Sequence, residues 1–279
     1  MPAFETLKRQ LTRISDDTAH LIDEAEKITE RVDEGFSQWK TTCQIISEQI
    51  SEEIMRVAVV GAIKSGKSTF ENTLFGGDYL KRGAGVVTSI VTRVRTGSRL
   101  RAALYLKNWD EVNRDIDQAS VLLPARNSSG EPHHVDIRRE KDRQILDRAL
   151  ADLAADQLIS NDTRRAGSVL LASYLNGYDR VEQVVQADSA TVEFGNDRFP
   201  LHRDFVGDDA MAVYLKDVLL EIDTPGLGDG VEIADCQGSD SPNPLHLAMI
   251  QDYLLTTHVI INVISSRTGL RRADLDFIS

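Results

Sequence analysis

A glycine-rich segment that ends in a lysine and a serine is the stretch of this chain best suited to chemistry. Residues 61–68 read GAIKSGKS and fit the pattern G-x-x-x-x-G-K-S/T at every fixed position. Gly61 and Gly66 would let the backbone wrap around an anion with its N–H groups pointing inward. Lys67 would set a positive charge against the β- and γ-phosphates, and the Ser68 hydroxyl would bind Mg²⁺. The pattern therefore predicts a phosphate-binding loop.

The elements on either side of this loop support that interpretation. Residues 57–60 form an apolar, β-branched run typical of a buried strand. After the loop, Phe70, Leu74 and Phe75 form the apolar stripe of a helix whose N-terminus, near Gly66, adds partial positive charge. Strand, loop and helix together predict a nucleotide site, and its predicted binding residues are Gly61, Ala62, Ile63, Lys64, Ser65, Gly66, Lys67, Ser68 and Thr69.

A second group of candidate residues follows another apolar strand, residues 218–222. Asp223 ends this strand, and the sequence continues Thr-Pro-Gly to Gly226. A P-loop nucleoside triphosphatase places its Mg²⁺-side aspartate after such a strand, and the N–H of Gly226 could contact a γ-phosphate. A loop held by that phosphate would collapse when the phosphate leaves. Alone, this tetrapeptide is also a good turn sequence, so the prediction depends on its combination with the first motif.

The remaining chain alternates predicted strands and helices. We expect strands at 90–94, 101–106 and 258–264, a regular segment at 211–215 with a turn at 216–217, and helices at 109–123, 140–158, 167–175 and 268–279. A mobile, polar segment is expected after Gly230, as far as Pro244, followed by a short helix to about Leu255. Around a P-loop, this alternation predicts an α/β fold with a mostly parallel, doubly wound sheet and the ligand at the carboxyl ends of the strands.

Residues 1–54 are predicted to form a separate helical segment. Their apolar residues recur at alternating spacings of three and four, with an expected break at Gly35. A lone helix cannot bury such a stripe, so the segment needs a helical partner. That partner would be a helical bundle of the same chain or, alternatively, a second copy in a coiled coil. The rest, residues 55–279, is one domain with a largely helical insertion at about 107–205.

The composition is ordinary for a soluble globular protein, which we expect to be cytoplasmic. The chain has 279 residues, of which 41% are hydrophobic, and a net charge of −12. This charge argues against nucleic-acid binding, which needs a basic surface. Two cysteines far apart in the sequence fit a reducing compartment. No apolar run reaches the roughly 18 residues of a membrane-spanning helix, so any membrane contact is expected to be peripheral.

Three segments together resemble the GTPase domain of the dynamin superfamily, particularly that of bacterial dynamin-like proteins. They are the loop at 61–68, GAGVVTS at 83–89 and LLEIDTPGLGDG at 219–230. The resemblance covers roughly residues 50–106 and 210–279. It implies hydrolysis of GTP to GDP with Mg²⁺, coupled to self-association through the GTPase domain and to membrane remodelling. By resemblance, Thr88 would bind Mg²⁺ and help hold the attacking water, with Thr92 as the alternative.

The resemblance also bears on catalysis. Leu227, which follows Gly226, cannot orient a water molecule as the glutamine of small GTPases does. The family lacks that glutamine too, and relies on the P-loop and on dimerisation across the nucleotide. Lys64 stands where relatives bind a monovalent cation or place a polar side chain. We hypothesise that its ammonium group supplies that charge, which makes Lys67, Thr88 and Lys64 the catalytic candidates; alternatively, Lys64 faces solvent.

Two departures from the family pattern affect what the resemblance implies. Glu71 occupies a helix position that is usually apolar, which puts the packing of that helix in doubt. The guanine-recognition box N/T-K-x-D is absent, since no lysine follows Lys216, and we therefore expect the sequence to be a fragment. Two alternatives to a GTPase stay open. One is a nucleotide-binding switch module with little turnover, and the other is a P-loop ATPase.

Overall fold

The computed structural model describes residues 2–29, 34–62, 64–80, 90–120, 134–155, 162–185, 190–224, 226–236, 250, 253–267 and 269. The chain divides into two compact units, Met1–Met55 and Arg56–Ser279. The first unit is helical. The second is built around a seven-stranded sheet.

The first unit is a pair of antiparallel helices, α1 (Pro2–Thr29) and α2 (Glu34–Glu52). Contacts run between the start of one helix and the end of the other: Lys8 pairs with Glu53, and the Ser15 hydroxyl donates to the carbonyl oxygen of Cys43 at 2.8 Å. Lys40 of α2 pairs with Asp23 of α1. Much of this contact is polar, and buried residues of α1 include Ser15 and Ile22.

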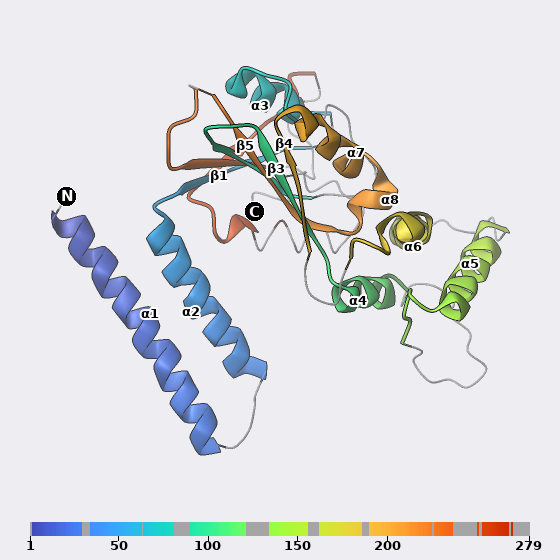
Figure 1. The fold of residues 1–279 in the computed structure, drawn as a ribbon, viewed down its shortest axis with the longest axis horizontal. Helices are drawn as coiled ribbons and strands as arrows, with labels where there is room; N and C mark the ends of the chain where they lie inside the picture. The colour runs from blue at the N-terminus through green and yellow to red at the C-terminus, as the bar shows by residue number, and fades with distance from the viewer. Residues whose placement is uncertain are drawn as a thin grey trace. The chain divides into compact units, whose positions relative to one another are not determined.

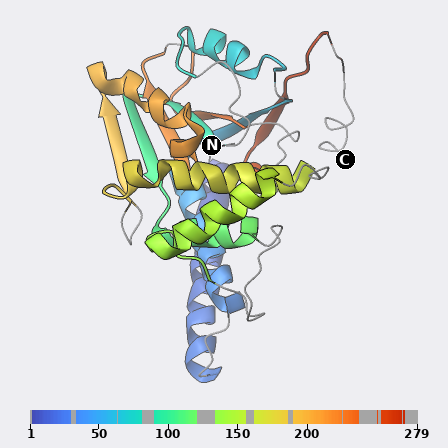
Figure 2. The ribbon, with the colours of Figure 1, turned by 90° about the vertical axis from the view of Figure 1, so that its right-hand side faces the viewer.

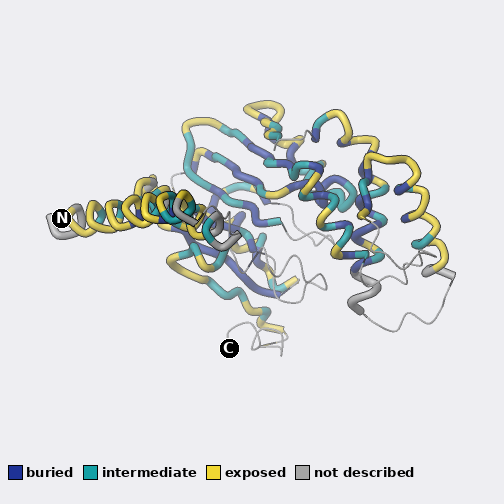
Figure 3. The backbone as a smooth tube through the Cα atoms, turned by 90° about the horizontal axis from the view of Figure 1, so that it is seen from below, coloured by how far each residue is buried: buried dark blue, intermediate teal, exposed yellow. Residues whose placement is uncertain are grey.

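One sequence expectation about this unit needs correction. Gly35 lies inside α2, so the helical break falls before it. The predicted stripe is largely uncovered within the described residues: Leu7, Ile14 and Leu21 are 53%, 61% and 64% exposed. Figure 3 shows both helices as mostly exposed. The pairing of α1 with α2 therefore satisfies only part of the need for a helical partner.

The sheet of the second unit has the order β4-β3-β5-β2-β6-β1-β7. Its strands are β1 (Met55–Val60), β2 (Thr92–Thr96), β3 (Arg101–Leu106), β4 (Thr191–Gly195), β5 (Leu215–Ile222), β6 (Val231–Asp235) and β7 (Val259–Asn262). The pairs β1–β7 and β2–β5 are parallel. The pairs β2–β6, β3–β4 and β3–β5 are antiparallel. The α/β class is thus confirmed, but the sheet is mixed rather than mostly parallel.

The helices of this unit whose bounds the structure gives are one helix after the P-loop and a group that follows β3. The former is α3 (Lys67–Phe75). The latter are α4 (Trp109–Ser120), α5 (Glu140–Ala155), α6 (Asp162–Val181), the 3-10 helix η1 (Asn196–Leu201), α7 (His202–Val206) and α8 (Asp209–Ala212). Figures 1 and 2 show α4, α5 and α6 grouped beside one another, and both α4 and α5 contact α6.

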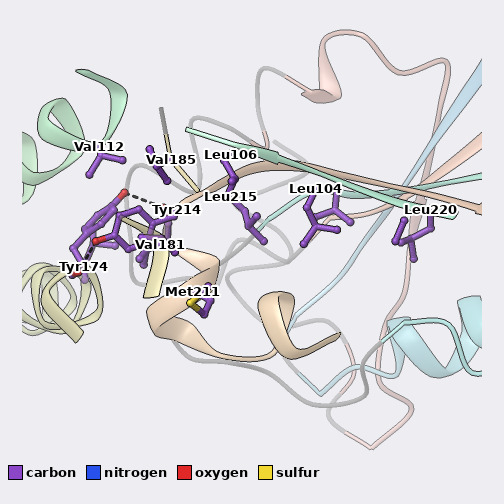
Figure 4. Packing of buried hydrophobic residues seen from close by; sticks show 14 of the residues in the cluster. Leu104, Leu106, Val112, Tyr174, Val181, Val185, Met211, Tyr214, Leu215 and Leu220 are labelled. Carbon is purple, nitrogen blue, oxygen red and sulfur yellow. Dashed lines mark hydrogen bonds between the residues drawn. The ribbon is translucent and has the colours of Figure 1, made fainter. Parts of the chain in front are cut away.

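One hydrophobic core joins these helices to the sheet. Leu104 and Leu220, on neighbouring strands, are fully buried, and the same cluster continues into α4 and α6 through Tyr174 and Tyr214. The Tyr214 hydroxyl donates to the carbonyl oxygen of Tyr174 at 2.6 Å, which satisfies a polar group inside the core (Figure 4). The predicted helical insertion is therefore part of the main core and not a separate module.

Several predicted elements differ from the observed ones. Residues 216–217 are not a turn but belong to β5, and α8 covers only Met211 and Ala212 of the regular segment predicted at 211–215. The polar segment predicted after Gly230 begins with a strand, β6. The strand predicted at 258–264 is β7, whose Val259 and Ile260 are 43% and 52% exposed among the described residues. The helix predicted at 268–279 lies outside the described residues, except for Gly269.

Candidate nucleotide-binding site

The loop after β1 has the backbone that the glycine pattern requires. Gly61 has φ 152°, and a Cβ atom there would lie 2.3 Å from the carbonyl oxygen of Val263. Val263 follows β7 and donates its N–H to the carbonyl oxygen of Val60 at 2.8 Å, so the loop starts in contact with the neighbouring strand. Gly66 has φ 104° and precedes α3 directly. Glycine is needed at both positions because residues with a Cβ atom disfavour these conformations.

Lys67 lies inside this loop. Its ammonium group donates a hydrogen bond to the carbonyl oxygen of Gly61 at 2.9 Å, and the residue is only 8% exposed. The loop is closed further by a hydrogen bond from the N–H of Ser65 to the carbonyl oxygen of Ala62, 3.0 Å long. The arrangement holds a positive charge and the N-terminal N–H groups of α3 close together, which is suited to binding phosphate.

A carboxylate faces the P-loop from β6. The Ser68 hydroxyl donates to Oδ2 of Asp235, the last residue of β6, at 3.4 Å. Cys236, the next residue, donates its N–H to the carbonyl oxygen of Val59 near the end of β1 at 2.9 Å. The ends of β1 and β6 therefore meet beside the P-loop. Ser68 lies next to Asp235 because the P-loop follows β1 and Asp235 is the last residue of β6.

Glu71, one turn into α3, adds a second acidic side chain to this region. It is fully buried, and both of its carboxyl oxygens lack a hydrogen-bond partner in the described structure, as does Oδ1 of Asp235. Burial and the neighbouring Asp235 raise the pKa of Glu71 to about 10, although Lys67 opposes the shift. Burial also raises the pKa of Asp235, against the effects of Lys67 and Ser68. Lys67 is thus the buried positive charge that offsets the raised pKa values of both Glu71 and Asp235.

The aspartate that the sequence singled out lies elsewhere. Asp223 follows β5 and is exposed. Because β5 is parallel to β2 and β2 is antiparallel to β6, the end of β5 points away from the end of β6. The next residue, Thr224, donates to the carbonyl oxygen of Phe75 at the far end of α3. The structure therefore brings Asp235, and not Asp223, to Lys67 and Ser68.

The other predicted residues are distributed as follows. Lys64 is exposed, with φ 65° in the left-handed region, and Thr69 is exposed in the first turn of α3. Gly226 is exposed, and a Cβ atom there would lie 3.1 Å from the carbonyl oxygen of Leu74. Gly226 therefore lies, like Thr224, near the far end of α3. Ile63 and Thr88 lie outside the described residues. Thr92, the alternative to Thr88, is buried in β2 opposite Asp235 in the strand register.

Sequence reasoning missed Asp235 and understated Glu71. A signal for Asp235 was present, because residues 231–235 read VEIAD, a short apolar segment that ends in aspartate as LLEID does at 219–223. The predicted stripe of α3 is wrong in two of three positions: Phe75 is buried, whereas Phe70 and Leu74 are 41% and 38% exposed. Glu71 and Asn72 occupy buried positions instead.

The residues around Ser68 fit a divalent cation such as Mg²⁺. This ion prefers oxygen ligands, and buried carboxyl oxygens without partners are of that kind. Among the described residues no group of three or more His, Cys, Asp and Glu side chains forms a metal site. The protein ligands that lie together there are the Ser68 hydroxyl and the carboxyl group of Asp235, which suits an ion that usually retains water molecules and nucleotide phosphates as further ligands.

Strand, glycine-rich loop and helix, with Lys67 buried inside the loop, define a P-loop nucleotide-binding fold. The model of the dynamin family matches residues 57–279, and the chain belongs to this family. Members of the family are GTP hydrolases.

Two solved structures are similar to the chain, both described as an oligomerised bacterial dynamin pair that provides a mechanism for long-range sensing and tethering of membranes. The identities are 14% and 16% and the TM-scores 0.48 and 0.47, over 97% and 96% of this chain. The chain spans only 36% and 35% of the lengths of those proteins. No curated protein matches it.

Proposed function

We propose that this protein is a dynamin-like GTPase that binds GTP and hydrolyses it to GDP and phosphate with Mg²⁺. The observation that supports this most directly is the buried Lys67 inside the P-loop of a dynamin-family chain. Beside it, the Ser68 hydroxyl donates a hydrogen bond to the carboxyl group of Asp235. Guanine as the base is proposed from the family alone, because the guanine-recognition box is absent from this sequence.

In this proposal the N–H groups of residues 61–69 and the side chain of Lys67 bind the phosphates. Lys67 exchanges its hydrogen bond with the carbonyl oxygen of Gly61 for one with a phosphate oxygen, so it is already placed within the loop. Ser68 and Asp235 would hold Mg²⁺, which stabilises charge on the phosphates when bound. The exposed Lys64 would supply the additional charge in the transition state. Thr88 would help hold the attacking water.

Asp223 and Gly226 keep a proposed role as the phosphate-sensing loop. Since both are exposed and lie near the far end of α3, the role requires that this loop move to reach the γ-phosphate. Such rearrangements of a loop on nucleotide binding are known in GTPases. The proposed role of Asp223 and Gly226 therefore requires a conformational change of their loop, whereas Lys67 and Ser68 can bind phosphate and Mg²⁺ without any rearrangement of the backbone.

We further propose that the complete protein is cytoplasmic, self-associates and contacts a membrane peripherally. Family membership and the membrane tethering attributed to the similar bacterial dynamins support this proposal. The exposed leucines of α1 also favour a further helical partner. No helix among the described residues is both long and apolar enough to cross a membrane.

Comparing the binding of mant-GTP and mant-ATP tests this proposal. The protein should bind mant-GTP more tightly, and Lys67→Ala should lose binding of either nucleotide, because the loop then lacks its buried positive charge. Equal binding of the two nucleotides, or tighter binding of mant-ATP, would favour the ATPase alternative. Undiminished binding by Lys67→Ala would show that the P-loop is not the nucleotide site.

The second candidate is a nucleotide-dependent switch with little turnover, and the position of Leu227 favours it. Leu227 is 7% exposed, and its carbonyl oxygen accepts a hydrogen bond from the Thr96 hydroxyl at 2.8 Å. A buried leucine cannot activate water. Phosphate release per protein molecule should rise with protein concentration if assembly drives hydrolysis, and should stay constant and low for a switch.

A further inference from the structure

One side of α1 is apolar, and α2 leaves it uncovered among the described residues. Four large apolar side chains lie there at spacings of four, three and seven residues, and they are 53%, 43%, 61% and 64% exposed: Leu7, Leu11, Ile14 and Leu21. These spacings place all four on one side of a helix. We call this row of side chains the seam of α1.

Helix α2 packs against a different side of α1. Lys8 pairs with Glu53, and the Ser15 hydroxyl donates to the carbonyl oxygen of Cys43 at 2.8 Å. Ile22, seven residues after Ser15, is only 8% exposed. Each of these residues of α1 directly follows a residue of the seam, and successive residues of a helix point about 100° apart. Helix α1 therefore has one side for α2 and an adjacent side that suits a further helix.

The seam has the features of a coiled coil and not of a helix that lies on a membrane. Its residues occupy two positions of a seven-residue repeat, which gives a narrower stripe than an amphipathic surface helix has. Membrane-surface helices are also rich in Lys and Arg, whereas α1 carries six acidic and four basic residues. The polar residue of the seam, Thr18, donates its hydroxyl to the carbonyl oxygen of Ile14 at 2.7 Å. A helix packed on the seam would thus leave this hydroxyl with its partner.

The charges of α1 indicate which helix fits the seam. Residues 2–14 carry three basic side chains and one acidic one, whereas residues 15–29 carry five acidic side chains and one basic one. Two copies of α1 that run in opposite directions would set the basic half of each against the acidic half of the other. Two parallel copies would bring like charges together, which is unfavourable. The helix is therefore complementary to itself in the antiparallel direction.

We propose that the seam of α1 pairs with α1 of a second copy of this chain, with the two helices antiparallel. When the helices overlap along their whole length, Leu11 lies opposite the partner's Leu21, and Ile14 lies opposite the partner's Thr18. The two-fold axis of such a pair repeats every contact. The proposal rests on the proposed function in that it assigns a surface to the self-association proposed there, and this surface lies outside the GTPase unit.

Sedimentation of the full chain without nucleotide tests the pairing. The wild type should be a dimer, and the double variant Leu11→Gln/Leu21→Gln should dimerise about a hundredfold more weakly or not at all, because each leucine is buried twice by symmetry. Leu201→Gln/Leu255→Gln is the matched control, since it replaces two exposed leucines of the second unit and should dimerise like the wild type. A monomeric wild type, or an α1 variant that dimerises as tightly as wild type, would overturn the proposal.

Crosslinking through introduced cysteines tests the direction of the helices. Cys43→Ser provides the background, because the other cysteine of the chain, Cys236, is fully buried. In this background, chains with Leu11→Cys mixed with chains with Leu21→Cys should form a disulfide between the two variants on mild oxidation. A disulfide of Leu11→Cys chains with one another instead would show a parallel pair and overturn the antiparallel arrangement. Circular dichroism checks that each variant is folded, which is expected because both leucines are exposed in the single chain.

Failure of this proposal can be told apart from failure of the GTPase. Lys67→Ala should lose mant-GTP binding and still form the dimer, whereas Leu11→Gln/Leu21→Gln should lose the dimer and still bind mant-GTP. A protein that binds mant-GTP but dimerises only when nucleotide is present would overturn the pairing through α1 and support the proposed nucleotide site. A dimer that depends on the seam in a protein that binds no nucleotide would support the pairing and refute the GTPase.

Discussion

The hydroxyl group of Thr224 donates a hydrogen bond to the carbonyl oxygen of Phe75 at 3.0 Å, and Thr224 is only 4% exposed. This bond joins the segment after β5 to the last turn of α3, whose terminal carbonyl groups have no partner within the helix. We predict that Thr224→Val destabilises the protein by about 1 kcal/mol, because a buried acceptor loses its donor while the side-chain volume is kept. Urea unfolding followed by circular dichroism would measure this change.

Thr73→Val is the matched control for Thr224→Val. The Thr73 hydroxyl bonds to the carbonyl oxygen of Thr69 within α3, but the residue is exposed and water can replace the lost bond. Its replacement should change the free energy of unfolding by less than about 0.5 kcal/mol. Equal effects of the two substitutions would show that the Thr224 bond does not hold the loop against α3.

A larger loss of stability is expected for Gly61→Ala. The added Cβ atom would lie 2.3 Å from the carbonyl oxygen of Val263, a backbone atom that can move only if β7 shifts away from β1. We predict a loss of about 2 kcal/mol or more, with weaker nucleotide binding. Gly76→Ala provides the comparison, since φ is 69° there but nothing lies within 4 Å, and it should lose only about 1 kcal/mol. Thermal unfolding of both variants would test the order.

The P-loop could be predicted from the sequence because its signals are local. The strand before residue 61, the two glycines and the helix after Gly66 all act within about twenty residues, and each has a physical reason that does not depend on the rest of the fold. The same holds for β3, which has the predicted bounds 101–106. Strong local patterns of this kind are seldom overridden by tertiary contacts.

What lies beside the P-loop could not be predicted in this way, because strand order is a non-local property. Both β5 and β6 contain an apolar run that leads to an aspartate, Asp223 directly after β5 and Asp235 at the end of β6, and only the packing of the sheet decides which strand lies next to β1. The buried position of Glu71 was unpredictable for a related reason. Hydrophobic periodicity assumes that charged residues face water, an assumption that fails where a charged group is buried near other charges.

Glu71 gives the protein a pH-dependent stability in the absence of metal. Burial raises its pKa from the ordinary value of about 4.5 to about 10, so the folded state holds a proton that the unfolded state releases between these pH values. The unfolded state therefore binds fewer protons in this window, and stability falls as pH rises from 4.5 towards 10, by up to about 1.4 kcal/mol per pH unit. Below pH 4.5 this contribution is constant.

Glu71→Gln tests that dependence because the amide cannot titrate. With EDTA present, the variant should gain stability relative to wild type as the pH is raised from 5 to 9, on top of a constant difference from the amide's own hydrogen bonding. Urea unfolding at several pH values would measure it. A difference between variant and wild type that does not change with pH would mean that Glu71 is not held in a buried, acidic environment.

The last prediction concerns Glu232, whose side chain is fully buried beneath two arginines of β2. Its carboxylate accepts hydrogen bonds from Arg95 at 2.5 Å, from Arg93 at 3.4 Å and from the Tyr253 hydroxyl at 2.9 Å. Glu232→Gln would take the buried negative charge away from Arg95 and Arg93, of which Arg93 also pairs with Asp217, and we predict a loss of about 3 kcal/mol. Glu193→Gln is the control: Glu193 pairs with Arg101 across β3 and β4, but its side chain is 52% exposed. That pair is screened by water, so its loss should change stability by less than about 1 kcal/mol. If the two variants unfold at the same urea concentration, the carboxylate of Glu232 does not hold β2 against β6.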